Sequence, residues 1–301
     1  MNADLLTDRG NGTHRRSRAS AARMPAYLEP GASTAVESNV SYRLGKLRER
    51  GVLRGSWLDC GCASGGYTIA LAQHGADEVI GVDLEADRIA RAQADRPADL
   101  DNVAFCCASS EELPFPDGRF DGVLLNEVLE HVGDERATLA EIRRVLKPHG
   151  VLALMSPNRY FPFEGHGMRL GDRSIDVPVP ILPWLPSSLA MRYMRARNYW
   201  PGELRDLVRQ AGFEILVAES VFPVFEVYPW LPPAVVRRYR AAVPRLERTP
   251  FVNRFGVSTL VLARRPAEHQ PDAPVSRLNG QAPGAEVSET EALPAPLVVG
   301  G

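Results

Sequence analysis

The stretch "WLDCGCASGGYT", Trp57 to Thr68, indicates the fold class of this chain because it joins a short apolar run to a loop of small residues. Gly, Ala and Ser leave a loop backbone open to close approach by a ligand. The apolar residues before the loop predict a buried strand, and "GGYTIALAQHG" predicts a helix that Gly75 ends. Several cofactors bind at such a turn, so the residues around it have to show which one it fits.

Predicted strands and helices alternate from this turn to about residue 157. The expected strands are 57–60, 78–84, 102–108, 120–126 and 151–157, and the expected helices are 65–75, 85–96 and 134–147, the last halted by Pro148. A short amphipathic helix, Val40–Arg50, precedes them, and two strands, 214–220 and 256–265, follow as an antiparallel pair. The alternation predicts an α/β fold, a Rossmann-like doubly wound, mainly parallel sheet with a final antiparallel strand pair. Ligands of such sheets bind outside the carboxyl ends of the strands.

The composition describes a globular protein with no overall attraction to nucleic acid. The 301 residues are 45% hydrophobic, and 35 Lys and Arg oppose 37 Asp and Glu. The cysteines, Cys60, Cys62, Cys106 and Cys107, form neither a disulfide framework nor paired zinc-ligand motifs. We expect reduced thiols, a cytoplasmic location and no metal site.

The two ends of the chain differ in composition from the middle. Residues 1–34 are rich in Arg and Ser and read as a disordered arm, with an organellar transit peptide as the alternative. Residues 266–301 are rich in Pro, Ala, Glu and Gly and read as a disordered tail. The folded domain is expected at 35–265, with lid or cap segments at about 158–200 and 221–255 that combine aromatic and basic residues.

The loop fits neither of the two commonest phosphate-binding patterns. A dinucleotide fingerprint counted from Gly61 would need glycine at Ala63, and no Lys followed by Ser or Thr follows Gly65. What remains is an acid at the end of each of the first two strands, Asp59 and Asp83. A carboxylate after the second strand can accept both hydroxyls of a ribose, which indicates a nucleoside without identifying its tail.

Four ordered segments give the chain a resemblance to a known family. They are "LDCGCASGGYT", "GVDLEADRIARA", "ELPFPDGRFDGVLLNEVLEHV" and "EIRRVLKPHGVLAL". Over about residues 53–157 the chain resembles the class I S-adenosylmethionine-dependent methyltransferases, in particular the small-molecule (type 11) branch related to ubiquinone and menaquinone methyltransferases. The resemblance implies S-adenosylmethionine as cofactor and methyl transfer to a small-molecule or lipid- or glycan-linked acceptor, most readily at a hydroxyl oxygen.

The resemblance also assigns residues to the cofactor. Its methionine end would lie against Asp59, Gly61, Cys62, Ala63, Ser64 and Gly65, with Asp59 near the ammonium group. Asp83 would hold the ribose, Leu84 would cover adenine, and Ser109 and Ser110 would lie beside the adenine amino group and ring. The remaining expected cofactor residues are Glu111, Asn126 and Glu127. Many family members have Asp where this chain has Ser109, and a hydroxyl accepts a hydrogen bond more weakly than a carboxylate.

A hydroxyl acceptor needs a base, and two histidines are candidates. His166 lies on a Gly-flanked loop after the fifth expected strand, and His131 follows the fourth. The alternative for His131 is a structural role in which it ties neighbouring loops together. Glu130 is a weaker candidate base. The lid segments suit a bulky apolar or anionic acceptor or a membrane surface, and equally a packed cap with a solvated basic face.

Two other functions remain open at this point. One is an NAD(P)-dependent oxidoreductase on a similar sheet, against which Ala63 and "LPFPDGRFD" count. The other is a non-catalytic methyltransferase-fold binding protein, against which the intact cofactor residues count. Nucleic acid is not expected as a partner because "NEVLEH" stands where amino-group methyltransferases carry an Asn-Pro-Pro-aromatic segment.

Overall fold

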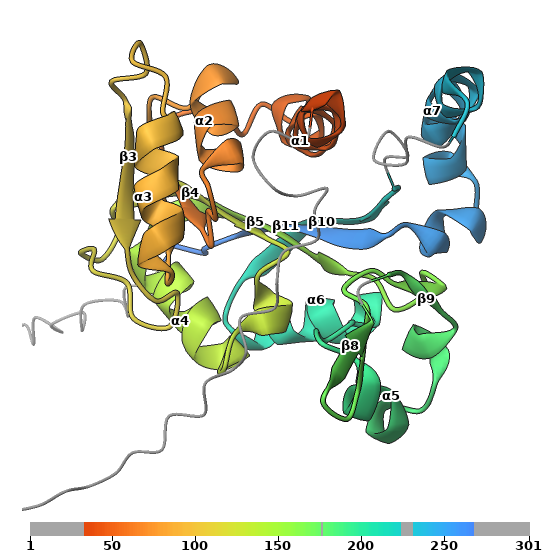
Figure 1. Ribbon diagram of the computed structural model, residues 1–301. Coiled ribbons are helices and arrows are strands. Elements are labelled where there is room, and N and C mark those ends of the chain that lie inside the picture. The colour runs from red at the N-terminus through yellow and green to blue at the C-terminus, as the bar shows by residue number, and fades with distance from the viewer. Residues whose placement is uncertain (1–32, 176, 224–230, 268–301) are drawn as a thin grey trace, which may run out of the picture. The chain divides into compact units, whose positions relative to one another are not determined.

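A computed structural model describes residues 33–175, 177–223 and 231–267. Seven strands form one sheet in the order β10-β11-β5-β4-β1-β2-β3 (Figure 1). They are β1 (Ser56–Cys60), β2 (Glu78–Asp83), β3 (Val103–Cys107), β4 (Phe120–Asn126), β5 (Leu146–Pro157), β10 (Glu214–Val221) and β11 (Ser258–Arg264). All neighbours are parallel except that β11 runs antiparallel to both β5 and β10. The predicted mainly parallel sheet with a final antiparallel pair is confirmed.

Helices cover both faces of this sheet, as Figure 1 shows for α1 and α2 on one side and α4 and α6 on the other. The helices are α1 (Ser33–Arg48), α2 (Gly66–Gln73), α3 (Ala86–Asp95), α4 (Glu135–Val145), α5 (Ser187–Tyr193), α6 (Pro201–Gln210) and α7 (Pro233–Arg248). Leu44 of α1 and Leu71 of α2 belong to one buried apolar cluster, and Leu139 of α4 and Leu204 of α6 belong to the other. Two covered faces explain why the central strands β1 and β4 are buried along nearly their whole length, whereas the edge strand β10 alternates.

The junction between α4 and β5 differs from the sequence-based expectation. The helix ends at Val145, and the strand begins at Leu146 instead of residue 151. His149 takes a left-handed φ of 65°, and the pairing of β5 with β4 shifts its register between Phe120 and Gly122. Pro148 thus lies in an irregular strand start rather than directly after a helix, because the backbone can leave helical geometry before the proline as well as at it.

Residues 158–200 do not continue the alternation, and we call them the cap. They contain the short strands β6 (Phe163–Glu164), β7 (Met168–Leu170), β8 (Arg173–Ile175) and β9 (Val179–Pro180), the 3-10 turn η3 (Leu182–Trp184), and α5. β6 pairs with β9 and β7 pairs with β8. Not all cap aromatics are free for an acceptor, because Tyr199 is buried in the main core. A lid function for the cap stays a prediction.

The second expected lid segment, 221–255, begins inside β10 and continues with α7 and the 3-10 turn η5 (Val252–Phe255). Residues 224–230 of it, the N-terminal arm up to residue 32, and the tail from residue 268 lie outside the described residues. No helix among the described residues has the length and apolar character needed to cross a membrane. All four cysteines are free thiols.

Candidate active site

The loop between β1 and α2 is held in a conformation that requires glycine. Gly61 and Gly65 have φ values of 77° and 88°, and Ala63 between them has 49°. A Cβ at Gly61 would collide with Val128, and one at Gly65 would lie 2.7 Å from the Phe105 ring. Side chains are therefore excluded at both glycines by backbone geometry and by space. Backbone without large side chains is left at the carboxyl ends of β1 and β2, where the sequence predicted the methionine end of a cofactor.

Asp59, near the end of β1, is a buried carboxyl group with one hydroxyl partner. Its side chain accepts a hydrogen bond of 2.7 Å from Thr68 Oγ1, and only 2% of the residue is exposed. Burial raises the pKa of Asp59 to about 7, the nearby charge of Asp83 adds to the rise, and the Thr68 hydrogen bonds oppose it. A cationic group bound here would favour the charged form of Asp59 and remove the cost of leaving that charge buried.

Asp83 ends β2 and ties two loops together. Its Oδ2 accepts from the Ala63 backbone N–H at 2.9 Å, and its Oδ1 accepts from the Glu85 N–H at 2.9 Å. The Arg88 guanidinium lies 3.8 Å away. A carboxylate has about four acceptor directions, so these contacts leave capacity for a ligand. Beside it, Leu84 is 73% exposed, which is unusual for a leucine next to a buried strand and leaves an apolar surface that a flat ring could cover.

The segment after β3 is only partly available to a ligand. Ser109 Oγ accepts a hydrogen bond of 3.1 Å from the Glu111 backbone N–H, and its hydroxyl hydrogen can still be donated. The Glu111 carboxylate accepts from the N–H groups of Gly133 and Asp134 at 2.8 and 3.0 Å. Glu111 therefore connects two loops in this structure. A cofactor contact of Glu111 would have to share that carboxylate, and a contact of Ser109 would have to share its hydroxyl oxygen with the Glu111 N–H.

Asn126 and Glu127, after β4, meet a residue that sequence reasoning missed. Arg43 of α1 donates to Asn126 Oδ1 at 2.7 Å and to Glu127 Oε1 at 2.8 Å, and its other terminal nitrogen donates to Ser258 Oγ at 3.0 Å. Arg43 is 5% exposed. Burial would raise the pKa of Glu127, but the Arg43 charge and the Ser258 hydrogen bond outweigh it and lower that pKa. Glu127 also has a left-handed φ of 55°, and its side chain contacts α1 through Arg43.

Glu130 lies in the 3-10 turn η2 (Leu129–His131) and is 3% exposed. Its Oε2 accepts a hydrogen bond of 3.0 Å from the Ser156 hydroxyl, and its Oε1 is buried without a hydrogen-bond partner. Burial, together with the neighbouring Glu127 charge, raises the pKa of Glu130 well above its usual value. A buried oxygen of this kind carries a free-energy cost unless a ligand or proton satisfies it.

The structure brings the two candidate histidines together. The rings of His131 and His166 meet edge to face with centroids 5.1 Å apart. His131 is an exposed residue, but the protein atoms packed around its ring and the neighbouring His166 lower the pKa of His131 to about 4. Burial also opposes the charged form of His166, but the hydrogen bond and charge of Glu164 outweigh it and raise the pKa of His166. The closeness of residues 35 positions apart could not be read from sequence spacing.

His166 is oriented by two residues of the cap that sequence reasoning missed. Its Nδ1 lies 2.9 Å from Glu164 Oε1, and its backbone N–H donates to the same oxygen at 2.9 Å. Asn198 Nδ2 donates to the other Glu164 oxygen at 2.7 Å. Glu164 is fully buried. An ionised Glu164 leaves the Nδ1 proton on His166, so that Nε2 is the ring nitrogen available to a ligand.

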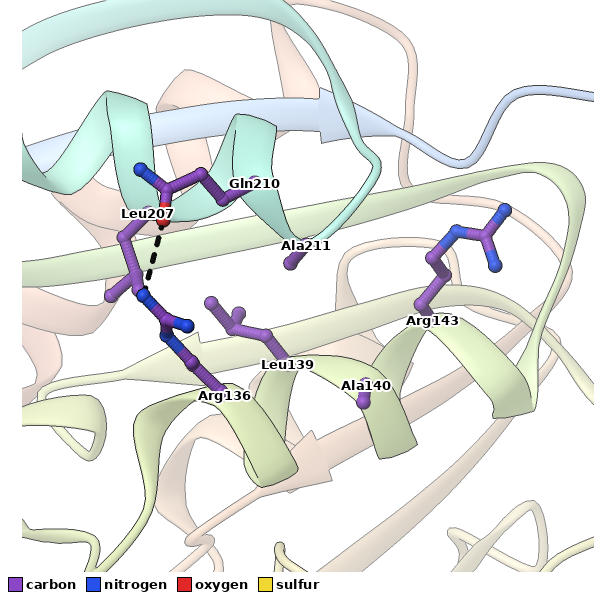
Figure 2. Close-up of a pocket in the computed structure, with 7 residues that line it drawn as sticks. All are labelled: Arg136, Leu139, Ala140, Arg143, Leu207, Gln210 and Ala211. Atoms are coloured by element: carbon purple, nitrogen blue, oxygen red, sulfur yellow. Dashed lines mark hydrogen bonds between the residues drawn. The ribbon is translucent and has the colours of Figure 1, made fainter.

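A groove between α4 and α6 has a volume of about 320 Å³ (Figure 2). It is lined by Arg136, Leu139, Ala140, Arg143, Leu207, Gln210 and Ala211. One long hydrogen bond of 3.4 Å joins Arg136 to Gln210 across it. The groove has neither acidic nor nucleophilic side chains, and it contains none of the residues predicted for the cofactor or for catalysis.

Known proteins similar to this chain include methyltransferases. Residues 58–154 match a family profile described as "Methyltransferase domain". The O-methyltransferase cnsE of Penicillium expansum is 30% identical over 182 residues, which cover 57% of this chain and 58% of that protein. A ubiquinone biosynthesis O-methyltransferase of Cereibacter sphaeroides is 30% identical over 177 residues, which cover 58% of this chain and 65% of that protein. The chain thus spans about three fifths of these curated relatives.

A solved structure supports the same fold. The S-adenosylmethionine-dependent methyltransferase of Mesorhizobium loti matches 76% of this chain and 99% of its own, with a TM-score of 0.51 and 20% identity. At that identity the similarity concerns the fold alone. The matched residues 58–154 include the glycine loop, Asp59 and Asp83, and over this segment the chain is similar to known methyltransferases.

Proposed function

We propose that this protein is an S-adenosylmethionine-dependent methyltransferase that methylates a hydroxyl oxygen of a small-molecule, lipid-linked or glycan-linked acceptor. The observation that carries the proposal is the proximity of two features along one sheet edge. The glycine loop and Asp83 offer a nucleoside site at the ends of β1 and β2, and His131 and His166 lie beyond the end of β4. Relatives named as O-methyltransferases support oxygen as the accepting atom.

The residues at the end of β1 fit the methionine portion of the cofactor. Gly61 and Gly65 would let it pass close to the backbone, because both positions exclude a side chain. Asp59 would hold its ammonium group. Bound S-adenosylmethionine would supply a methyl group on a positively charged sulfur, so the protein's task is to place a nucleophile in line and to exclude water.

The residues at the ends of β2 and β3 fit the nucleoside. Asp83 would accept the ribose hydroxyls, and Leu84 would cover one face of adenine, which gives a physical reason for its exposure. Ser109 and Ser110 would lie beside the adenine amino group and ring. Asn126 and Glu127, positioned by Arg43, would line the passage from the cofactor toward the histidines.

The histidine pair would act on the acceptor hydroxyl. A hydroxyl oxygen attacks a methyl group readily only when its proton is lost at or before the transition state. His166, fixed by Glu164 and Asn198, is the best positioned group for this activation, and the His131 ring lies against it.

Cofactor binding can be tested by calorimetry on the full chain. Asp83→Ala should weaken S-adenosylmethionine binding at least about 10-fold, since a hydrogen bond to a charged group contributes about 1.5–3 kcal/mol. Asp206→Ala removes an exposed carboxylate of α6 and should leave the affinity unchanged. Binding of NAD with no binding of S-adenosylmethionine would refute the proposal in favour of an oxidoreductase.

Activity can be tested with a labelled methyl donor and a panel of phenolic, quinol, glycan and lipid-linked hydroxyl acceptors. Product mass should rise by one methyl group, and alkaline stability of the product would distinguish an ether from an ester. His166→Ala should abolish transfer while cofactor affinity stays unchanged. Cofactor binding without transfer to any acceptor of the panel would favour a non-catalytic binding protein.

The cap also supports contact with an anionic membrane surface. It exposes large apolar side chains next to exposed arginines: Leu170, Ile175, Ile181, Trp184, Leu189 and Met191, with Arg169, Arg173 and Arg192. Apolar insertion and attraction to anionic headgroups add together in peripheral binding. The full chain should therefore sediment with vesicles containing phosphatidylglycerol, and Trp184→Ser with Arg192→Ser should reduce this. Equal sedimentation of variant and native chains would exclude this surface.

A further inference from the structure

We propose that Glu130, His131 and His166 bind one divalent transition-metal cation, with zinc as the type case, in the acceptor pocket. One ligand atom from each of these three residues lies within 4.8 Å of the other two. Zinc bonds of about 2.0–2.2 Å bring such atoms to roughly 3.4 Å apart in a tetrahedral site. Side-chain rotations that displace the ligand atoms by about 1 Å would therefore complete the site, and the backbone of the sheet would not have to move.

The buried oxygen of Glu130 gives independent evidence for a ligand. Ser156 occupies Oε2, and Oε1 is left without a partner although the residue is 3% exposed. The bond from Ser156 fixes the carboxylate so that one defined oxygen remains. A cation at the histidine pair would satisfy that oxygen in place of a proton.

His166 already has the environment of a metal ligand. A ligating histidine usually donates its second ring N–H to a carboxylate, which fixes the tautomer and the ring plane. Glu164 accepts in this way from Nδ1 at 2.9 Å and is itself held by Asn198 at 2.7 Å. Glu164 is fully buried, so its orientation is set by packing as well as by hydrogen bonds. The arrangement leaves His166 Nε2 free to point at a cation.

The donor set defines the class of cation. Two imidazole nitrogens and one carboxylate favour zinc and similar borderline cations over Mg²⁺ and Ca²⁺, which prefer oxygen ligands. Three protein ligands are typical of sites that keep a position for water or substrate. Sequence reasoning led us to expect no metal because it considered only the spacing of the cysteines, whereas these ligands come from two segments that the fold brings together.

A cation at this site would take part in the proposed methyl transfer, so its catalytic role rests on the proposed function. With the cation bound, His166 Nε2 would be a ligand and no longer the base. The acceptor hydroxyl would occupy the open position, where the cation lowers its pKa and its proton passes to solvent. The oxygen electron pair then forms the new bond to the methyl carbon while the carbon–sulfur bond breaks and its electrons remain on sulfur. The cation changes neither charge nor oxidation state, and no further reactant is needed.

Zinc binding can be measured without any methyl donor. The full chain, dialysed against chelator, should bind about one Zn²⁺ per chain in calorimetry, and bound Co²⁺ should give visible absorption bands of a low-coordinate site. His166→Ala and Glu130→Gln should each weaken Zn²⁺ binding more than 10-fold, and Glu164→Gln about 10-fold, the size of outer-shell effects. His74→Ala, which removes a histidine at the end of α2, is the matched control.

Two results would overturn the cation site. One is Zn²⁺ affinity that is the same in native, His166→Ala and Glu130→Gln chains whose thermal unfolding shows them to be folded. The other is a Co²⁺ spectrum that is identical in these three chains. Zinc binding as expected together with no transfer to any acceptor would leave the site standing and refute the proposed function. Methyl transfer together with zinc binding that is the same in all variants would refute the cation site and leave the proposed function standing.

Discussion

Replacing Arg43 by Met should destabilise the fold far more than loss of a surface charge. Arg43 is 5% exposed and is the cationic partner of Glu127 at 2.8 Å. Its loss leaves the partly buried Glu127 carboxylate with the Ser258 hydroxyl as its remaining partner, and the cost of about 3–5 kcal/mol for breaking a fully buried ion pair is the upper bound. Because small domains have free energies of unfolding of about 5–15 kcal/mol, that is a large fraction of the total. Urea unfolding followed by tryptophan fluorescence at pH 7 measures it.

The pair, rather than the arginine alone, should be responsible for this loss. Glu127→Gln in the Arg43→Met background should recover most of the stability, since uncharged replacements of both partners are often nearly neutral. Arg209→Met breaks an exposed ion pair with Asp206 and should cost no more than about 1 kcal/mol. If Arg43→Met costs no more than Arg209→Met, or costs the same with and without Glu127→Gln, the reasoning is wrong.

The pH dependence of this loss follows from the lowered pKa of Glu127. A carboxyl group whose pKa is lower in the folded than in the unfolded state stabilises the fold above its unfolded pKa. That stabilisation is lost as the pH falls through the folded pKa. The difference between native and Arg43→Met chains should therefore be full at pH 7 and shrink in acid. A difference that stays constant from pH 7 to pH 3 would contradict the assignment to Glu127.

Three further predictions concern the cofactor site. Because the pKa of Asp59 is raised to about 7, S-adenosylmethionine affinity should rise as the pH increases through 7, and Asp59→Asn should flatten this profile in calorimetry. The same raised pKa means that Asp59 lowers stability as the pH rises from about 4 to about 7, which thermal unfolding of the two proteins can check. Gly65→Ala should lower the free energy of unfolding in urea by at least about 1–2 kcal/mol, because the left-handed backbone at this position disfavours a residue with a Cβ. The same substitution should abolish cofactor binding. Leu84→Ser should weaken binding about 10-fold, equivalent to roughly 1.5 kcal/mol of apolar burial, with unchanged unfolding because Leu84 is exposed.

The sequence predicted the parts of this molecule that depend on local periodicity. Strands 78–84 and 120–126 were found close to where their apolar runs placed them, and Gly61 and Gly65 adopt the backbone that only glycine takes easily. The α4–β5 boundary was missed because a proline excludes a helix but does not say where the helix ends before it.

Contacts between distant segments could not be predicted in this way. Arg43 lies 84 positions from Glu127, and no pattern in a short amphipathic helix marks one of its arginines as buried. Glu164 and Asn198 meet His166 only because β6 and the end of the cap fold against each other. Glu111, chosen with its neighbours for a cofactor role, supports the loop at Gly133 because the chain folds back to it.

The position of β11 has a consequence for synthesis on the ribosome. This strand is the last of the sheet to be made, yet it lies between β5 and β10 and hydrogen-bonds to both. Until about residue 264 has emerged, β5 presents an unpaired apolar edge to the cell and β10 has no neighbour in the sheet. Exposed edges of this kind pair readily with other chains. A nascent chain stalled before Ser258 is therefore the form of this protein most prone to aggregate, and release of its final segment closes the sheet.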